Sequence, residues 1–209
     1  MVVRLLALLA FVLCCSISYA EPPDEKGKKM EIPLSEIWAN NIPGTKEIGR
    51  LAKQDPRLTG ITSALGFPPK EEAKPAFAVQ GKGLDALREA HAVIVDKRKS
   101  RDTFAAGSDV SVVFFAHETR SYVHLHKVER QGNNVNVSWR FVPHETEDMT
   151  RHVALISLGK LPSGKYRVNI IRSAMPQKYI DLGFRPTSDE VARRIVCGPF
   201  SFTVSEQGE

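Results

Sequence analysis

Apolar and polar side chains alternate most clearly along residues 134–142 of this chain. Alternation with a period of two places one set of side chains on each face of a strand, so this stretch predicts a strand with one buried face. The stretch Gln131-Gly132-Asn133-Asn134 predicts a hairpin turn, because glycine and asparagine tolerate positive φ angles. The apolar face would hold Val135, Val137, Trp139 and Phe141, and the polar face Asn136, Ser138 and Arg140.

Shorter apolar or alternating runs predict further strands along the chain. Residues 110–116 are strongly apolar, which predicts a central strand covered on both faces. Residues 83–90 predict a short helix. Strands of this length, joined by turns and without long helices between them, indicate a mainly β fold built as an antiparallel sandwich or barrel. The remaining predicted strands lie at residues 77–79, 92–95, 121–128, 153–158, 166–171 and 200–204.

One local segment favours the sandwich. Residues 161–168, Leu-Pro-Ser-Gly-Lys-Tyr-Arg-Val, resemble the tyrosine corner of immunoglobulin-like and fibronectin-type sandwiches. The resemblance implies that Tyr166 points into the core and bonds back to the backbone of the preceding connection, with Pro162 and Gly164 shaping the turn. It implies an antiparallel immunoglobulin-like sandwich and nothing about function, because function lies in sites rather than in folds.

Prolines divide the chain after its first twenty residues into two parts. They recur from Pro22 to Pro75, and none lies between residues 76 and 142. Residues 21–75 are therefore expected to form a turn-rich, partly helical segment at the amino-terminal side of a sandwich domain over residues 76–209.

Two short helices are predicted in the proline-rich segment. Residues 34–40 predict one or two helical turns, with Ile37 and Trp38 facing inward. Thr45 would cap a second helix over residues 46–53, because a threonine oxygen can accept a free backbone N–H at a helix start. The apolar face of that helix would hold Ile48, Leu51 and Ala52.

A long connection at residues 172–196 precedes the last predicted strand. Thr187 and Glu190 form a capping-box pattern that could start a short helix within it. Long connections in compact domains are often functional, so this insertion could be a binding loop. Alternatively it is a lid packed over the sandwich edge, with buried anchors at Tyr179, Ile180, Leu182 and Phe184.

The first twenty residues have the layout of a secretory signal peptide. A basic start at Arg4 precedes an apolar run at residues 5–13, and small residues at Ser18 and Ala20 precede an abruptly polar stretch. The apolar run is too short to span a bilayer as a helix. Cleavage near Ala20 would place the protein in the periplasm or outside the cell, with no transmembrane span in the mature chain.

Cleavage would also change the cysteine content. Cys14 and Cys15 would leave with the signal peptide, so Cys197 would be the last thiol and no internal disulfide could form. A lipoprotein is the less favoured alternative, because Leu13 stands before Cys14 where a small residue is usual. The mature domain would then depend on its packed core for stability.

The chain is mildly basic, with a formal net charge of +5 that cleavage lowers by one. The densest basic run lies at residues 96–102 and includes Lys97 and Arg98. With Arg185, Arg193 and Arg194 it could form a patch that binds carboxylate, sulfate or phosphate. The alternative is a solvated turn. Aromatic residues do not alternate with these cations, so nothing specifically indicates nucleic acid as the partner.

Most of the six histidines lie between His117 and His152. His124 and His126 stand two apart on a predicted strand, so both imidazoles would point to one face and could share a zinc or copper ion. His117 and His152 could complete such a site. The alternative is a set of separate surface histidines, because no complete ligand motif with metal spacing is present.

No motif for catalysis or for a cofactor emerges from the sequence. Cys197 has no base beside it, and the chain has no Gly-x-Ser-x-Gly elbow. The leading hypothesis is therefore an exported, non-catalytic binding module without a cofactor, whose partner is an unidentified protein or polysaccharide of the cell envelope or extracellular space. The alternative is an exported metal-binding protein that uses the clustered histidines.

Overall fold

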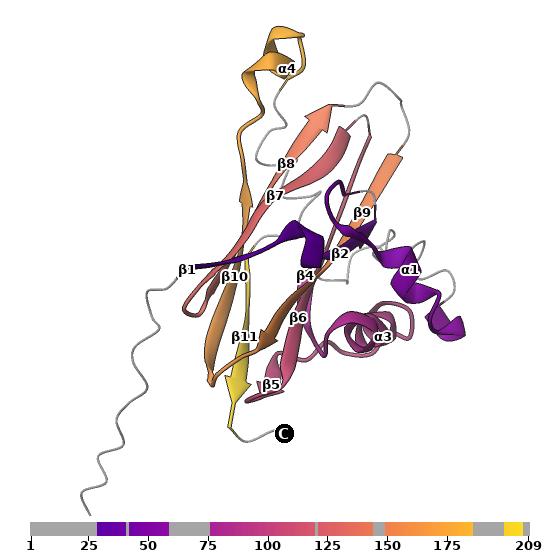
Figure 1. The fold of residues 1–209 in the computed structure, drawn as a ribbon, viewed down its shortest axis with the longest axis vertical. Helices are drawn as coiled ribbons and strands as arrows, with labels where there is room; N and C mark the ends of the chain where they lie inside the picture. Colours follow the sequence, from indigo (N-terminus) through magenta and orange to yellow (C-terminus); the bar gives the residue numbers. More distant parts are fainter. Residues whose placement is uncertain are drawn as a thin grey trace, which may run out of the picture.

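Two β-sheets pack face to face, and a helix covers the outer side of the second sheet (Figure 1). The computed structural model describes residues 29–40, 42–58, 76–119, 121–143, 149–185 and 199–206. The predictions for the signal peptide, for Cys197 and for the capping box at Thr187 and Glu190 fall outside these residues. In the part of the chain that the structure describes, no helix is long and apolar enough to cross a membrane.

The first sheet has the strand order β1-β7-β8-β10-β11-β5, and the second has the order β3-β2-β9-β6-β4. The first sheet comprises β1 (Lys29–Ile32), β7 (Ser121–Gln131), β8 (Asn134–Pro143), β10 (Gly164–Arg172), β11 (Phe200–Ser205) and β5 (Thr103–Ala105). The second comprises β3 (Lys46–Glu47), β2 (Trp38–Asn40), β9 (Met149–Lys160), β6 (Asp109–Thr119) and β4 (Ala76–Gln80). The helices are η2 (Leu34–Glu36), α1 (Ile48–Ala52), η3 (Pro56–Leu58), α3 (Gly83–Ile94) and α4 (Gln177–Asp181).

Both sheets are mixed, so the prediction of a purely antiparallel sandwich was wrong. β10 runs parallel to β8 and β5 runs parallel to β11 in the first sheet, while β2 and β3 are parallel in the second. The chain crosses from β8 to β9 in the opposite sheet and returns as β10. Two crossings restore the original direction of the chain, and β10 therefore lies parallel to β8. The mainly β class and the two-sheet architecture are as predicted.

The core has two layers, one between the sheets and one between the second sheet and α3. β9 contributes to both, because Ala154 and Ile156 point between the sheets while Val153 and Leu155 point toward the helix. β6 does the same with Phe114 and Val113 on opposite faces, which confirms the prediction of a strand covered on both sides.

β8 fits the alternation read from the sequence. Val135, Val137 and Trp139 are buried between the sheets, and the intervening polar side chains are half-buried on the outer face. The turn predicted before this strand lies at residues 132–133, where Gly132 has a φ of 55°. The hairpin of β7 and β8 is therefore as predicted.

The bond implied by the tyrosine-corner resemblance is present. Tyr166 is fully buried, and its hydroxyl donates to the Pro162 carbonyl oxygen at 2.9 Å. Its ring stacks on Phe202 of β11, with 5.3 Å between centroids and 10° between planes. Burial also raises the pKa of the Tyr166 phenol above its ordinary value, because it disfavours the charged form.

α3 is longer than predicted and includes a segment that the sequence indicated as a strand. The helix runs to Ile94, so the expected strand over residues 92–95 was wrong. A run of four apolar residues is too short to distinguish a strand from the end of a helix. The residues that α3 buries against the second sheet are Ala86, Leu87, Ala90 and Ile94.

The proline-rich segment supplies strands as well as short helices. β1 pairs with β7 at the edge of the first sheet, and β2 pairs with β9 in the second. The predicted helical turns at residues 34–40 shorten to η2, and residues 38–40 form β2. Ile37 is fully buried, as predicted, because it packs between the sheets.

α1 starts at Ile48 rather than at residue 46, because residues 46–47 form β3, and its cap also differs from the prediction. The Glu47 carboxylate, rather than the Thr45 hydroxyl, accepts from the Gly49 backbone N–H at 3.2 Å. Thr45 instead donates to the Ile42 carbonyl at 2.7 Å. The predicted apolar face of this helix is buried as expected.

A buried carboxylate ties the segment after α1 to α3. Asp55 is 5% exposed, and its Oδ2 accepts from both Arg57 and Arg88 at 2.7 Å, while its Oδ1 accepts from Arg57 Nε at 3.0 Å. These bonds hold the pKa of the Asp55 carboxyl well below its usual range, since they stabilise its charged form. Arg88 lies on α3, so Asp55 fixes the helix to the turn that contains Arg57.

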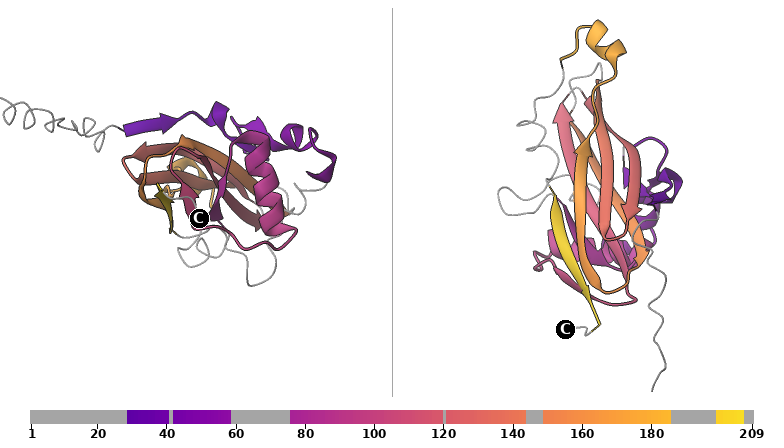
Figure 2. Two further views of the ribbon diagram at one scale, coloured as in Figure 1. Left: turned by 90° about the horizontal axis from the view of Figure 1, so that it is seen from below. Right: turned by 90° about the vertical axis from the view of Figure 1, so that its left-hand side faces the viewer.

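The connection after β10 projects beyond the ends of the strands and carries α4 (Figure 1; Figure 2). The anchors predicted for a lid are not buried there. Leu182 is 72% exposed, and Ile180 and Phe184 are each 38% exposed. The prediction that these side chains are buried was therefore wrong, since α4 extends away from the sheets.

Candidate ligand-binding site

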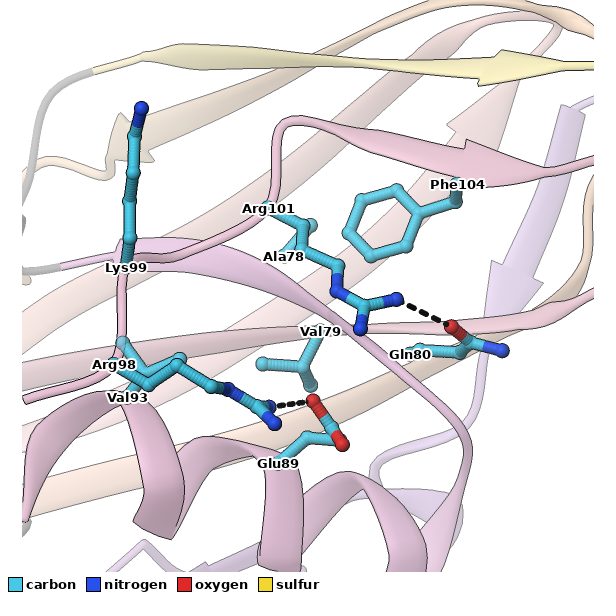
Figure 3. A pocket seen from close by; sticks show the side chains of 9 residues that line it. All are labelled: Ala78, Val79, Gln80, Glu89, Val93, Arg98, Lys99, Arg101 and Phe104. Atoms are coloured by element: carbon cyan, nitrogen blue, oxygen red, sulfur yellow. Dashed lines mark hydrogen bonds and ion pairs between the residues drawn. The ribbon is translucent and has the colours of Figure 1, made fainter. Parts of the chain in front are cut away.

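A shallow pocket lies where the two sheets end on the same side of the molecule. β4 is the last strand of the second sheet and β5 the last of the first, and the pocket lies between them beside α3 (Figure 3). Its volume is about 200 Å³ when the part open to solvent is included. The lining residues are Ala78, Val79, Gln80, Glu89, Val93, Arg98, Lys99, Arg101 and Phe104.

The end of α3 directs the basic run across this pocket. The Val95 backbone N–H donates to the His91 carbonyl at 2.7 Å, which completes the last helical turn. Lys97 then takes a φ of 53°, and the Arg98 N–H donates back to the Ala92 carbonyl at 2.9 Å. A left-handed residue after a helix reverses the chain, so residues 98–101 run back past α3 toward β5.

Three cations and one carboxylate set the charge of the pocket. The Arg98 guanidinium pairs with the Glu89 carboxylate across the opening, and Arg101 reaches the Gln80 amide oxygen at a long 3.4 Å (Figure 3). Lys99 extends away from both pairs, and among the described residues it has no hydrogen bond or ion pair. The pocket therefore keeps an excess of positive charge, with Lys99 and Arg101 as its least engaged cations.

The floor of the pocket is apolar and its rim is charged. Phe104 is 3% exposed and belongs to the core between the sheets, whereas Val79 and Val93 belong to the layer beneath α3. The space that the pocket encloses is about 10 Å³, room for about one water-sized group, whereas pockets that enclose whole small molecules are usually about 300–1,000 Å³. This smaller, open pocket suits one anionic group of a larger ligand, held by cations above an apolar surface.

The structure brings together only part of the predicted basic patch. Arg98 lines the pocket and Lys97 precedes it outside the lining, whereas Arg185 follows α4, which lies at the end of the molecule away from α3 and β5 (Figure 1). Arg193 and Arg194 fall outside the described residues. A ligand at the pocket would therefore meet Arg98, Lys99 and Arg101 rather than Arg185.

The histidines occupy separate environments. His152 is fully buried on β9, and His124 is half-buried on β7. His126 is exposed at a register shift where β7 has one residue more than β8. His117 lies on β6 opposite Arg151, and its side chain is outside those described. Within the described part of the chain, no three metal-ligating side chains converge. The metal hypothesis stays a prediction.

His124 should make stability fall in mild acid. Burial, and then the charge of Arg140 opposite it on β8, lower the pKa of His124 below the ordinary value of about 6.5. The unfolded chain therefore binds a proton at His124 more readily than the folded chain does. The stability that neutral His124 contributes above about pH 6.5 is lost as the pH falls from that value toward the lowered pKa. We expect His124→Gln to show a smaller loss of unfolding free energy between about pH 7.5 and 5.5. Urea unfolding at both pH values measures this. His126→Gln, on the same strand but exposed, should behave as the parent chain, and an equal change in both variants would contradict the prediction.

Sequence reasoning found the cations of the pocket but not the residues that complete it. Glu89 lies nine positions before Arg98 on the preceding helix, and Gln80 lies on a strand that passes beneath the basic run. Only the arrangement of β4, α3 and β5 brings them together. The capping of α3 by a left-handed residue had no signal in the sequence, because Lys97 is not a residue type that favours that conformation.

Taken together, the fold and the pocket define a mainly β, two-sheet protein with a helix over one sheet and a basic pocket at the sheet edges. Comparison of the chain with protein-family models, with curated proteins and with solved structures finds no match.

Proposed function

We propose that this protein is an exported, non-catalytic binding module that takes an anionic group of a larger ligand, such as a sulfated or carboxylated polysaccharide, at the pocket between β4 and β5. The observation that carries the proposal is the excess of positive charge around Lys99 and Arg101 above an apolar floor. Planar guanidinium groups and lysine ammonium groups are the usual donors to sulfate and carboxylate.

Three further observations support this reading. The signal-peptide layout of residues 1–20 supports export. The pocket is too shallow to enclose a whole small molecule, which favours recognition of one group on a polymer. The cations belong to a connection held between α3 and β5, and binding residues are commonly presented on such connections by a rigid scaffold.

Binding of dextran sulfate tests the proposal, with unsubstituted dextran as the neutral counterpart. We expect the chain to bind dextran sulfate and not dextran, and replacement of both Lys99 and Arg101 by serine to weaken binding about tenfold. Isothermal titration calorimetry at physiological salt measures the difference. Both residues are exposed, so the substitutions should leave the fold intact, as far-ultraviolet circular dichroism would verify.

The matched control is Lys165→Ser, which removes an exposed lysine from β10. A polyanion attracts any basic protein to some extent, so the proposal depends on the position of the lost charge. If Lys165→Ser weakened binding as much as a single Lys99→Ser substitution, the pocket would not be the binding site. Absence of any binding to dextran sulfate would also overturn the proposal.

A further inference from the structure

The projection that carries α4 presents apolar side chains to solvent far from the pocket. Leu182 is 72% exposed, and Ile180 and Phe184 are each 38% exposed. All three belong to residues 177–185, here called the tip, which projects beyond the ends of the strands (Figure 2). Large apolar side chains gathered on a surface indicate a contact with another phase or molecule.

The tip holds these side chains in a defined shape. Gly183, with a φ of 87°, ends α4, and its N–H donates to the Ile180 carbonyl at 2.9 Å. The Phe184 N–H reaches the Tyr179 carbonyl at 3.1 Å, and the two rings pack edge to face with 6.3 Å between centroids. This is a Schellman motif with its accompanying apolar contact. A preformed tip loses little conformational entropy when it binds.

The charges of the tip favour one kind of surface. Lys178 and Arg185 form no ion pair within the described residues, and the Lys178 ammonium lies 4.9 Å from the centroid of the Tyr179 ring. The single carboxylate, that of Asp181, accepts from the Gln177 amide at 2.8 Å. Apolar side chains flanked by unpaired cations and an aromatic pair are typical of segments that enter the interface of an anionic bilayer.

We propose that the tip docks into the surface of a bilayer rich in anionic phospholipid, with Leu182 and Ile180 entering the acyl boundary and Lys178 and Arg185 meeting the headgroups. The convex shape of the tip lets these apolar side chains enter the interface without burying the sheets. The elements α3 and β5, which border the pocket, lie at the end of the molecule away from α4 (Figure 1), so docking would leave the pocket open to solvent. This proposal does not depend on the function proposed for that pocket.

A tryptophan at position 184 provides a local probe in the full chain. The fluorescence of Phe184→Trp, corrected with that of the parent chain, is followed on vesicles of phosphatidylcholine with about 30 % phosphatidylglycerol. We expect a blue shift and quenching by brominated lipid on these vesicles, and neither on phosphatidylcholine alone. Adding Ile180→Ser and Leu182→Ser should weaken vesicle binding at least tenfold, because each removes apolar area that enters the interface.

Two further variants separate charge from apolar contact. Lys178→Gln and Arg185→Gln should each weaken binding about fivefold, whereas Val95→Ser should have no effect. Val95 is 42% exposed and lies at the end of α3, so it controls for the loss of an exposed apolar side chain elsewhere.

Several outcomes would overturn docking of the tip. These are equal binding to neutral vesicles, a probe signal that survives loss of Ile180 and Leu182, and tip-dependent capture of a protein without vesicle binding. The Lys99 and Arg101 substitutions should leave the probe signal unchanged. Failure of the pocket and failure of the tip can therefore be told apart.

Discussion

Phe202→Ala is expected to lower the free energy of unfolding by about 3–5 kcal/mol, the usual range for truncating a buried phenylalanine. Phe202 is 2% exposed on β11 and lies at the centre of an aromatic cluster. It stacks on Tyr166, and it meets Phe104 edge to face at 5.6 Å between centroids and 87° between planes. Its removal leaves a cavity between the tyrosine corner and β5, because both neighbouring rings are fixed on paired strands.

Urea unfolding followed by far-ultraviolet circular dichroism measures this effect. Phe184→Ala is the control, since it makes the same change at a side chain exposed on the tip and should shift stability by less than about 1 kcal/mol. Similar losses in the two variants would show that Phe202 does not occupy the packed centre that the structure gives it. The aromatic cluster also supports Phe104, which forms part of the pocket floor. Phe202→Ala should therefore weaken binding of dextran sulfate as well as lower the free energy of unfolding.

The parts of the fold that the sequence predicted share one property: their signal is local. The alternation along β8 assigns its buried face without knowledge of any partner strand, and the bond from Tyr166 to Pro162 spans only four residues. In each case the residues that decide the structure stand next to one another in the chain. The helix α1 was similarly visible from the spacing of its apolar face, although its cap was not.

The parts that the sequence did not predict depend on pairing between distant segments. β5 has three residues and β2 has three, too few for a periodicity to be seen. Their strand conformation comes from the neighbours β11 and β9, which complete their hydrogen bonds. The parallel pairing of β8 with β10 likewise follows from the path of the chain between sheets, which side-chain patterns do not encode.

The same distinction explains how much of the pocket could be predicted. A run of cations is visible in any sequence, so residues 96–102 were found as a candidate anion site. Whether such a run is a solvated turn or part of a pocket depends on what lies beneath it. That answer required the edge of β4, the floor from β5 and the carboxylate of Glu89, which come from three separate elements.

Leu87→Ala is expected to lower the free energy of unfolding by about 2–5 kcal/mol, because it removes a fully buried side chain from the layer between α3 and the second sheet. The second sheet is apolar on both faces, so this layer is required to keep Val113, Val153 and Leu155 from water. Leu84→Ala, on the same helix but only partly buried, should cost clearly less. Thermal unfolding of the two variants compares them directly. Equal losses would mean that Leu87 is packed no more tightly than the partly buried Leu84.

The apolar layer between α3 and the second sheet also affects the pocket. α3 carries Glu89 and Val93 and sets the direction in which the basic run leaves toward β5. If Leu87→Ala loosens α3 on the sheet, binding of dextran sulfate should weaken even at temperatures where the chain stays folded. Leu84→Ala should leave that binding close to the parent value. Unchanged binding in Leu87→Ala would indicate that the contacts of residues 98–101 with β4 and β5 alone hold the cations in place.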